Sequence, residues 1–339
     1  MPVVRYDPKE IDDEKLRALY QIHVVDETES YPGVPAVSFE QWAVWERASV
    51  RASALVARYL AEESGSVVGS ATMMRWPVDD PDNGFVVMAV LPGHRQRGIG
   101  RSMLEAALDD LEAAGVPRLI VDCPARRPWE SALGRLGLSH VFTEKMSRLS
   151  LESLDLELMD LWIERATERA ADYDLLFLED PIPDEHIEQW CRVRNVLSTA
   201  PREDLEMADH LVTPEEWRQR EQSTRDREDR HVAFVAVHRG SGEFTGYTDV
   251  QIPAYDRSRI SQHGTAVDPF HRDRGLGRLV KASMAKWIVE NYPEAKWVDT
   301  GNAGSNAAML GINIEMGFET VLVLHAWQGD IATVRSTLA

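Results

Sequence analysis

The sequence predicts a mixed α/β protein with two domains that share one order of strands and helices. The chain has 339 residues, a length that usually forms two domains rather than one. A twelve-residue stretch also occurs twice, at 90–101 and at 267–278, with eight identical positions and a constant offset (275 − 98 = 177). An apolar strand precedes each copy and an amphipathic helix follows it, so we expect the whole architecture to be duplicated.

The first half begins with a strand pattern and two helical patterns, which three strand patterns follow. Two more helices come after these, and a strand follows each of them. Ser38 and Gln41 form a capping box before the second helix. In order, the expected elements are strand 3–7, helix 16–22, a helix after 38, strands 54–61, 67–74 and 85–89 (with a loop at 79–84 before the last), helix 102–111, strand 118–122, helix 129–136 and a closing strand in 141–149.

The second half repeats this order. Thr213 and Glu216 form a capping box with Pro214 at the first helical position. We expect a first domain at 1–152, a linker helix at 153–172 and a second domain at 173–339. Within the second domain, we expect strand 175–178, helices 184–197 and from 213, strands 232–237, 244–252, 260–267 and 297–300, helix 306–316 and strand 318–327.

Composition excludes several classes of protein. The formal net charge is −19, which argues against a nucleic-acid partner and favours a cationic substrate such as an amine. The chain lacks a run of 18 apolar residues and a signal-peptide core, so we expect no membrane association. Two cysteines, Cys123 and Cys191, are too few for a disulfide framework or a metal site, and the expected setting is the cytoplasm.

The repeated turn has the chemistry of an anion site. A strand, a glycine-rich turn and a helix together point free backbone N–H groups at a bound anion. Met103 and Val280 stand where a dinucleotide fingerprint needs its third glycine, and neither copy has the Gly-Lys-Ser/Thr of a P-loop. The remaining pattern, Val-x-Pro followed by Arg-x-x-Gly-x-Gly, resembles motif A of the GNAT N-acetyltransferases.

That resemblance implies two tandem GNAT-fold domains, as in mycothiol synthase and the tandem acetyltransferases of actinobacterial antibiotic gene clusters, such as that for clavulanic acid. It implies binding of acetyl-CoA, or another acyl-CoA, through the turns. Asn302 and Asn306 resemble the second cofactor motif of the family. The cofactor-binding residues implied are Ala89, Val90, Arg95, Gln96, Arg97, Gly98, Ile99, Gly100, Arg101, Ser102, Ala266, Val267, Arg272, Asp273, Arg274, Gly275, Leu276, Gly277, Arg278, Asn302 and Asn306.

The two halves differ where this second motif lies. The first half has no asparagine there, and its two motif glycines are closer together (137 − 98 = 39 against 317 − 275 = 42). We therefore expect the first domain to bind coenzyme A mainly as a structural ligand and the second to catalyse transfer. In the family a tyrosine often protonates the leaving thiolate, and Asn313 and Leu133 stand at that position. Asn313 can donate a hydrogen bond but no proton.

His263 is the candidate general base, because strand alternation predicts that it shares a face with Thr265 and Val267. Asp249 and Glu243 are weaker candidates. The expected activity is acyl transfer from coenzyme A to an amine of a small molecule, in antibiotic or other specialised metabolism. A non-catalytic acyl-CoA-binding or sensing protein is the alternative. In a third possibility both domains transfer, with the loop at 123–129 replacing the missing asparagine.

Overall fold

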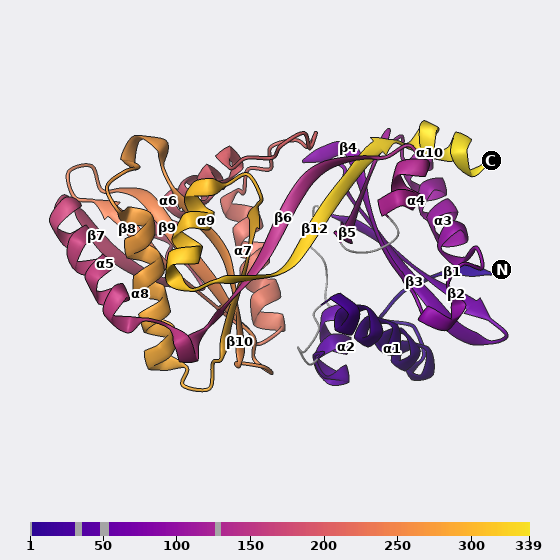
Figure 1. Ribbon diagram of the computed structural model, residues 1–339, viewed down its shortest axis with the longest axis horizontal. Coiled ribbons are helices and arrows are strands. Elements are labelled where there is room, and N and C mark those ends of the chain that lie inside the picture. The colour runs from indigo at the N-terminus through magenta and orange to yellow at the C-terminus, as the bar shows by residue number, and fades with distance from the viewer. Residues whose placement is uncertain (1, 31–35, 48–53, 126–129) are drawn as a thin grey trace. The chain divides into compact units, whose positions relative to one another are not determined.

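The computed structural model describes residues 2–30, 36–47, 54–125 and 130–339 (Figure 1). They form two compact units, each containing a mixed sheet and helices. Unit 1 consists of Met1–Glu144, Arg202–Asp209 and Leu322–Ala339, and unit 2 consists of Lys145–Pro201 and His210–Val321. The units therefore differ from the contiguous domains expected at 1–152 and 173–339, because two segments of the second half belong to unit 1.

Unit 1 is built on a sheet with strand order β1-β2-β3-β4-β5-β12-β6. Only the first part of β6 and the last part of β12 belong to it. Its elements are β1 Val3–Tyr6, α1 Asp13–Ser30, α2 Phe39–Arg47, β2 Leu55–Glu63, β3 Ser66–Trp76, β4 Asp80–Val90, the 3-10 turn η1 Pro92–His94, α3 Ile99–Ala113, β5 Arg118–Pro124, α4 Glu130–Arg135, β6 Ser139–Ser150, β12 Glu319–Asp330 and α10 Ile331–Leu338.

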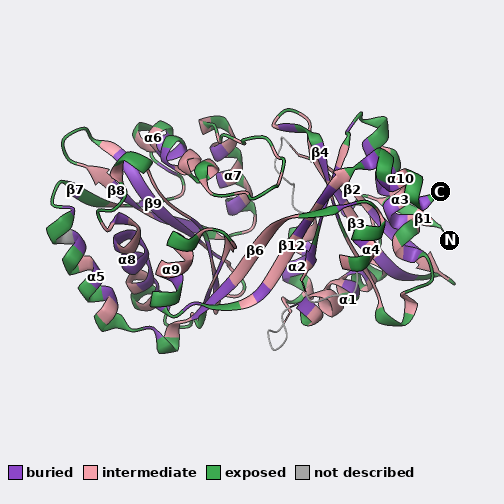
Figure 2. Ribbon diagram, turned by 45° about the horizontal axis from the view of Figure 1, so that its top comes forward, coloured by how far each residue is buried: buried purple, intermediate pink, exposed green. Residues whose placement is uncertain are grey.

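Unit 2 has strand order β6-β11-β10-β9-β8-β7, in which β8 and β9 are largely buried (Figure 2). Its elements, besides the shared strands, are η2 Leu151–Ser153, α5 Leu156–Arg169, β7 Tyr173–Glu179, α6 Asp184–Asn195, η3 Val196–Thr199, α7 Pro214–Asp226, β8 Arg230–His238, β9 Glu243–Ile252, β10 Arg259–Val267, η4 Pro269–His271, α8 Leu276–Asn291, β11 Trp297–Ala303 and α9 Ala307–Met316.

The end of the chain completes unit 1. Residues Leu324–Asp330 of β12 pair antiparallel with β5, and Ile331, Val334 and Leu338 of α10 are buried in the same core as α3. In the same way, the second part of β6 belongs to unit 2, where Arg148 binds Asp299 of β11 through two hydrogen bonds of 2.7 and 2.8 Å. The sequence pattern predicted neither this exchange nor α10.

Two predicted elements have a different role or extent. The expected linker helix is α5, and it is an integral part of unit 2: Met159 and Trp162 are buried in its core, and Ala166 packs with the start of α8. The expected loop at 79–84 mostly belongs to β4. Asn83 is buried and its Nδ2 donates to Asp80 Oδ1 at 2.9 Å, which satisfies two polar side chains at the start of this strand.

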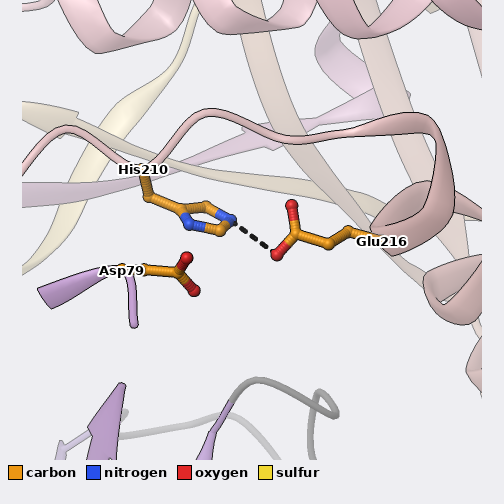
Figure 3. Close-up of side chains that lie close together, drawn as sticks. All are labelled: Asp79, His210 and Glu216. Atoms are coloured by element: carbon orange, nitrogen blue, oxygen red, sulfur yellow. Dashed lines mark ion pairs between the residues drawn. The ribbon is translucent and has the colours of Figure 1, made fainter. Parts of the chain in front are cut away.

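The capping box predicted at the start of α7 is confirmed. Thr213 Oγ1 accepts from the N–H of Glu216, and Glu216 Oε2 accepts from the N–H of Thr213. His210 Nε2 lies 3.6 Å from Oε1 of the same carboxylate (Figure 3). None of the helices in the described ranges is long and apolar enough to cross a membrane.

Candidate functional site

The two glycine-rich turns are built alike. The N–H of Leu91 donates to Val68 O at 3.0 Å in unit 1, and the N–H of Asp268 donates to Thr245 O at 2.8 Å in unit 2. These four residues are related by the same offset as the sequence repeat (268 − 91 = 177 and 245 − 68 = 177). The repeat in the sequence is therefore also a repeat in hydrogen bonding.

Each turn is braced by its first arginine. Arg95 Nε donates to Val90 O at 2.8 Å, and Arg272 Nε donates to Val267 O at 3.1 Å. This bond joins the turn to the last residue of the preceding strand. These two arginines, expected among the cofactor contacts, thus also hold the shape of the turn from within.

The backbone then passes through two left-handed residues before the helix. The φ angles are 62° at Gln96 and 81° at Gly98 in unit 1, and 63° at Asp273 and 84° at Gly275 in unit 2. Alternation of left-handed and ordinary residues turns successive N–H groups toward one side, which makes an anion-binding concavity. Glycine adopts this conformation without strain.

The helices that follow have open N-termini. Gly98 caps α3 and Gly275 caps α8, and neither cap has a side chain that accepts from the helix N–H groups. The first-turn amides of Ile99–Arg101 and of 276–278 have no partner within their helices. Together with the helix dipole, they favour a phosphate group.

The charges around the turns differ between the units. In unit 1, Arg95 binds Glu29 in a bidentate pair (3.1 and 2.9 Å), and Glu63 lies 3.2 Å from Arg97 and 2.6 Å from His94. These carboxylates neutralise positive charge that a pyrophosphate would need.

In unit 2, Arg272 Nη2 reaches the hydroxyl of Thr199 at 3.4 Å, and the Arg274 guanidinium lies 6.0 Å from the ring of Tyr173. Tyr173 also hydrogen-bonds His271 Nδ1 at 2.6 Å, which supports the turn. The described part of the chain shows no carboxylate against Arg272 or Arg274. Arg272 and Arg274 thus lack the carboxylate partners that Arg95 and Arg97 have, whereas Arg278 at the start of α8 binds Glu315 at 2.8 Å.

A gap opens between the parallel strands beside each turn. In unit 2, β10 pairs with β11 only from Arg259 to Gln262, although β10 continues to Val267. In unit 1, β4 pairs with β5 only from Asn83 to Phe85. The unpaired ends leave backbone groups free to bind an extended chain such as the pantetheine arm of coenzyme A.

One backbone N–H at this gap is well placed for chemistry. In an antiparallel ladder, alternate residues point their N–H groups toward the partner strand. Asp268 donates to Thr245 of β9, so Ala266 also faces β9 whereas Val267 faces the gap between β10 and β11. An N–H in this position can stabilise negative charge that develops on a thioester oxygen.

Strand β10 contains a bulge just before these residues. Its pairing with β9 shifts register between Gln262 and Thr265. This shift overturns the expected alternation. The side chain of His263 contacts Arg220 of α7. The hydroxyl of Thr265 instead bonds that of Thr248, which accepts from Gln262, and Gln262 in turn accepts from Lys281 of α8. His263 therefore does not share a face with Thr265.

His263 is poorly suited to remove a proton. Its Nδ1 accepts from Nη2 of Arg220 at 2.7 Å. Partial desolvation and the neighbouring Arg220 lower the pKa of His263, although Asp249 opposes the shift and the side chain is exposed to solvent. A base of such a low pKa accepts a proton from an ammonium ion only at great cost.

Three asparagines border the gap from β11 and α9. Asn306 caps α9 by accepting from the N–H of Met309 at 3.2 Å, and Gly317 ends this helix in a left-handed conformation, both as the sequence predicts. Nδ2 of Asn313 donates to Oδ1 of Asn302 at 2.6 Å. Asn313 Oδ1 is buried and has no hydrogen-bond partner among the described residues. This acceptor suits an N–H group of a ligand.

Unit 1 lacks this asparagine group. Leu133 in α4 is buried in the core of unit 1, and residues 126–129 of the loop at 123–129 lie outside the described residues. Both units have an uncapped helix N-terminus, and unit 2 fits a coenzyme A molecule better because Arg272 and Arg274 have no carboxylate against them among the described residues and Asn313 offers a buried acceptor. The resemblance implies a strand bulge around Ala266 and Val267, and the shift of register in β10 lies just before these residues, between Gln262 and Thr265.

Comparison with known proteins agrees with this geometry. Residues 16–134 match the model of the acetyltransferase (GNAT) family. The fold resembles that of a tandem GNAT protein from the clavulanic acid biosynthesis pathway, with a TM-score of 0.78 and 20% sequence identity over 97% of this chain and 98% of that one. It also resembles a GCN5-related N-acetyltransferase from Sphaerobacter thermophilus, with a TM-score of 0.65 and 13% identity over 97% and 95% of the two chains.

The chain also resembles a glucosamine N-acetyltransferase region of a fungal β-N-acetylglucosaminidase, with a TM-score of 0.67 and 11% identity over 97% of this chain and 38% of that one. No curated protein matches the sequence significantly. The fold and the duplicated turn define a GNAT acetyltransferase fold. More narrowly, the two units together have the fold of a tandem GNAT protein.

Proposed function

We propose that the chain is an acyl-CoA-dependent N-acyltransferase in which unit 2 transfers the acyl group to an amine of a small molecule. The observation that carries this proposal is the combination at one gap of unit 2: an uncapped α8 N-terminus, the Val267 N–H and the buried Asn313 oxygen. GNAT proteins use acyl-CoA, and this arrangement suits its pyrophosphate, thioester and pantetheine arm respectively.

The reaction forms a C–N bond and breaks a C–S bond. The neutral amine nitrogen attacks the thioester carbon, and the oxygen gains negative charge beside the Val267 N–H. The C–S bond then breaks to release the thiolate, and the proton lost by the nitrogen passes through solvent to the thiolate. Asn302 and Asn313 orient the ligand through hydrogen bonds. Neither asparagine supplies a proton to the thiolate, because a side-chain amide does not ionise at any pH at which the protein is folded.

A matched pair of variants tests which unit acts. A Cβ at Gly277 would lie 3.5 Å from the nearest side chain, and a Cβ at Gly100 would lie 3.8 Å from the nearest one, so a Cβ makes ordinary van der Waals contact at both positions. Gly277→Glu places a carboxylate at the α8 amides and should abolish acetyl-CoA binding in unit 2 and turnover. Gly100→Glu should leave turnover within a few-fold and mainly affect stability.

Calorimetric titration with acetyl-CoA and a free-thiol assay over a panel of amines provide the two readouts. Loss of turnover in a folded Gly100→Glu variant, with Gly277→Glu active, would reverse the assignment of the units. The acyl-CoA sensor remains a second candidate, favoured by the lack of an ionisable acid at Asn313 and by the low pKa of His263. It predicts binding of acetyl-CoA without thiol release for every amine.

The acceptor that we propose is a cationic amine of specialised metabolism. The net charge of −19 favours a cationic amine. The resemblance to a tandem GNAT protein of clavulanic acid biosynthesis makes antibiotic or other specialised metabolism a reasonable place to look for that amine.

A further inference from the structure

Four buried charged side chains lie beneath the bulge of β10. Oδ2 of Asp249 accepts from Arg194 Nη1 at 2.5 Å and from His231 Nε2 at 2.9 Å, and His231 Nδ1 lies 3.1 Å from Asp180 Oδ1. Each of the four side chains is at most 9% exposed. Burial lowers the pKa of His231, but hydrogen bonds to both aspartates outweigh it and raise that pKa. A protonated His231 makes the group neutral overall.

The second oxygen of Asp249 binds the bulge itself. Oδ1 accepts from the backbone N–H of Gly264 at 2.7 Å. In a regular ladder this N–H would bond the main-chain oxygen of the facing residue on β9. The carboxylate of Asp249 takes the place of that oxygen, so the bulge leaves no buried donor unsatisfied. A hydrogen bond to an ionised acceptor is stronger than the neutral bond that it replaces.

Position 264 requires glycine because a Cβ there would clash with neighbouring side chains. A Cβ on Gly264 would lie 2.5 Å from the hydroxyl of Tyr247 and 3.1 Å from Asp249 Oδ1. Both neighbours are fully buried, and the guanidinium of Arg194 lies 5.5 Å from the Tyr247 ring and 5.0 Å from the Trp217 ring. The surrounding side chains therefore cannot retreat without breaking the charged group.

Unit 1 has no such device. The positions that correspond to Asp249 and Gly264 are Thr72 and Val87 (249 − 72 = 177 and 264 − 87 = 177). Thr72 and Val87 are paired partners in a ladder that runs without a shift from Gly69 to Arg75. The bulge and its buried acceptor thus distinguish the unit with the asparagine group from the unit without it.

We infer that Asp249, held by Arg194 and His231, is a positioning residue that fixes the bulge at Gly264 and thereby sets the path of 265–267 along the acyl-CoA gap. A bulge bends its strand and re-aims the residues beside it. The inference rests on the proposed function of unit 2, because the Val267 N–H is the group to be aimed. Asp249 itself touches no reacting atom.

The test compares Asp249→Asn with a control that removes another buried carboxylate, Glu221→Gln. Glu221 is 1% exposed and binds the N–H of Ile182 and the side chain of Arg218. Both variants should lose stability. Only Asp249→Asn should lower kcat, by roughly 10- to 100-fold with KM for acetyl-CoA changed less than about threefold, since one misaligned oxyanion donor costs this much.

A spectroscopic readout makes the result independent of turnover. His263 and Gly264 form the only His-Gly pair in the chain, so carbonyl-labelled histidine with ¹⁵N-glycine gives one NMR signal, that of the Gly264 amide. Its proton should move upfield in Asp249→Asn and stay in place in Glu221→Gln. An unchanged Gly264 signal in Asp249→Asn, or an unchanged kcat, overturns the inference. Absence of turnover in the wild type counts against the proposed function alone.

A second pair of variants covers the case in which Asp249→Asn does not fold. Gly264→Ala should lower kcat through the clash with the Tyr247 hydroxyl, and the added change Tyr247→Phe should restore part of it by removing that hydroxyl. If Gly264→Ala keeps full kcat, the bulge does not set the path of 265–267 and the inference is wrong.

Discussion

Nε of Arg272 donates to the carbonyl oxygen of Val267 at 3.1 Å, so the arginine expected to bind phosphate also holds the residue whose N–H faces the gap. We expect Arg272→Ala to raise KM for acetyl-CoA by about tenfold, because one charge-assisted contact and the brace are lost together. Arg272→Lys should recover little, since lysine cannot reproduce the Nε contact. Steady-state kinetics at low salt provides the measurement.

The corresponding change in unit 1 is the control. Arg95 donates to Val90 and binds Glu29. Arg95→Ala should lower the melting temperature with KM for acetyl-CoA unchanged within about twofold, if unit 2 alone transfers. A tenfold rise in KM from Arg95→Ala would show that the turn of unit 1 takes part in turnover.

The pH dependence of transfer should follow the amine rather than the protein. The pKa of His263 is lowered by partial desolvation and by Arg220, so the imidazole is neutral in the ordinary assay range, and Asn313 does not ionise. We expect kcat/KM to rise tenfold per pH unit until the pKa of the acceptor amine is reached, because only the neutral amine attacks. The profile of His263→Gln should have the same shape. An inflection near neutral pH that disappears in His263→Gln would contradict this prediction.

Lys281 should make unit 2 more stable as the pH rises. It is 1% exposed in α8 and donates to Oε1 of Gln262, and burial lowers its pKa to about 7 from 10.5. Between these values the unfolded chain binds a proton that the folded chain does not, so stability increases from pH 7 toward pH 10. Below pH 7 the full cost of the buried charge is present.

Lys281→Met should therefore raise stability at pH 6 by roughly 1 kcal/mol, after the loss of the Gln262 contact is counted. It should also remove the part of the upward slope due to this lysine. Chemical denaturation at pH 6, 8 and 9.5 measures both effects. A variant that is less stable than the wild type at pH 6, with an unchanged slope, would refute the account of Lys281 as a buried, costly cation.

Tyr247→Phe should be nearly neutral for folding. The Tyr247 hydroxyl is buried and finds no hydrogen-bond partner in the described part of the chain, and burial raises its pKa to about 12. Removing an unsatisfied hydroxyl costs little and can stabilise by up to about 1 kcal/mol. Thermal denaturation of Tyr247→Phe checks this. A loss of more than about 2 kcal/mol would contradict this prediction and show that the hydroxyl makes a stabilising contact.

Sequence reasoning recovered local features better than distant ones. The turns at Gly98 and Gly275 and the caps at Thr213 and Asn306 follow from short patterns, because neighbouring residues alone determine them. The bulge at Gly264 involves Asp249, which lies 15 positions away on another strand. Strand alternation cannot reveal a shift of register, and so it put His263 on the wrong face.

Sequence patterns also did not predict which segments belong to each unit. The closing strand was expected within 318–327, and β12 does occupy that region. Which strand it pairs with depends on competition between distant partners. The buried Ile331, Val334 and Leu338 that complete the core of unit 1 follow this strand in a short helix, whose pattern is too brief to indicate its partner.

Because 322–339 belongs to the same compact unit as the first 144 residues, the ribosome can complete that unit only after it has made residues 145–321. A nascent first half is then left with an open sheet edge beside β5 until the last strand emerges. Cells that translate this protein must shield that edge throughout elongation, and expressing either half separately should give material that aggregates.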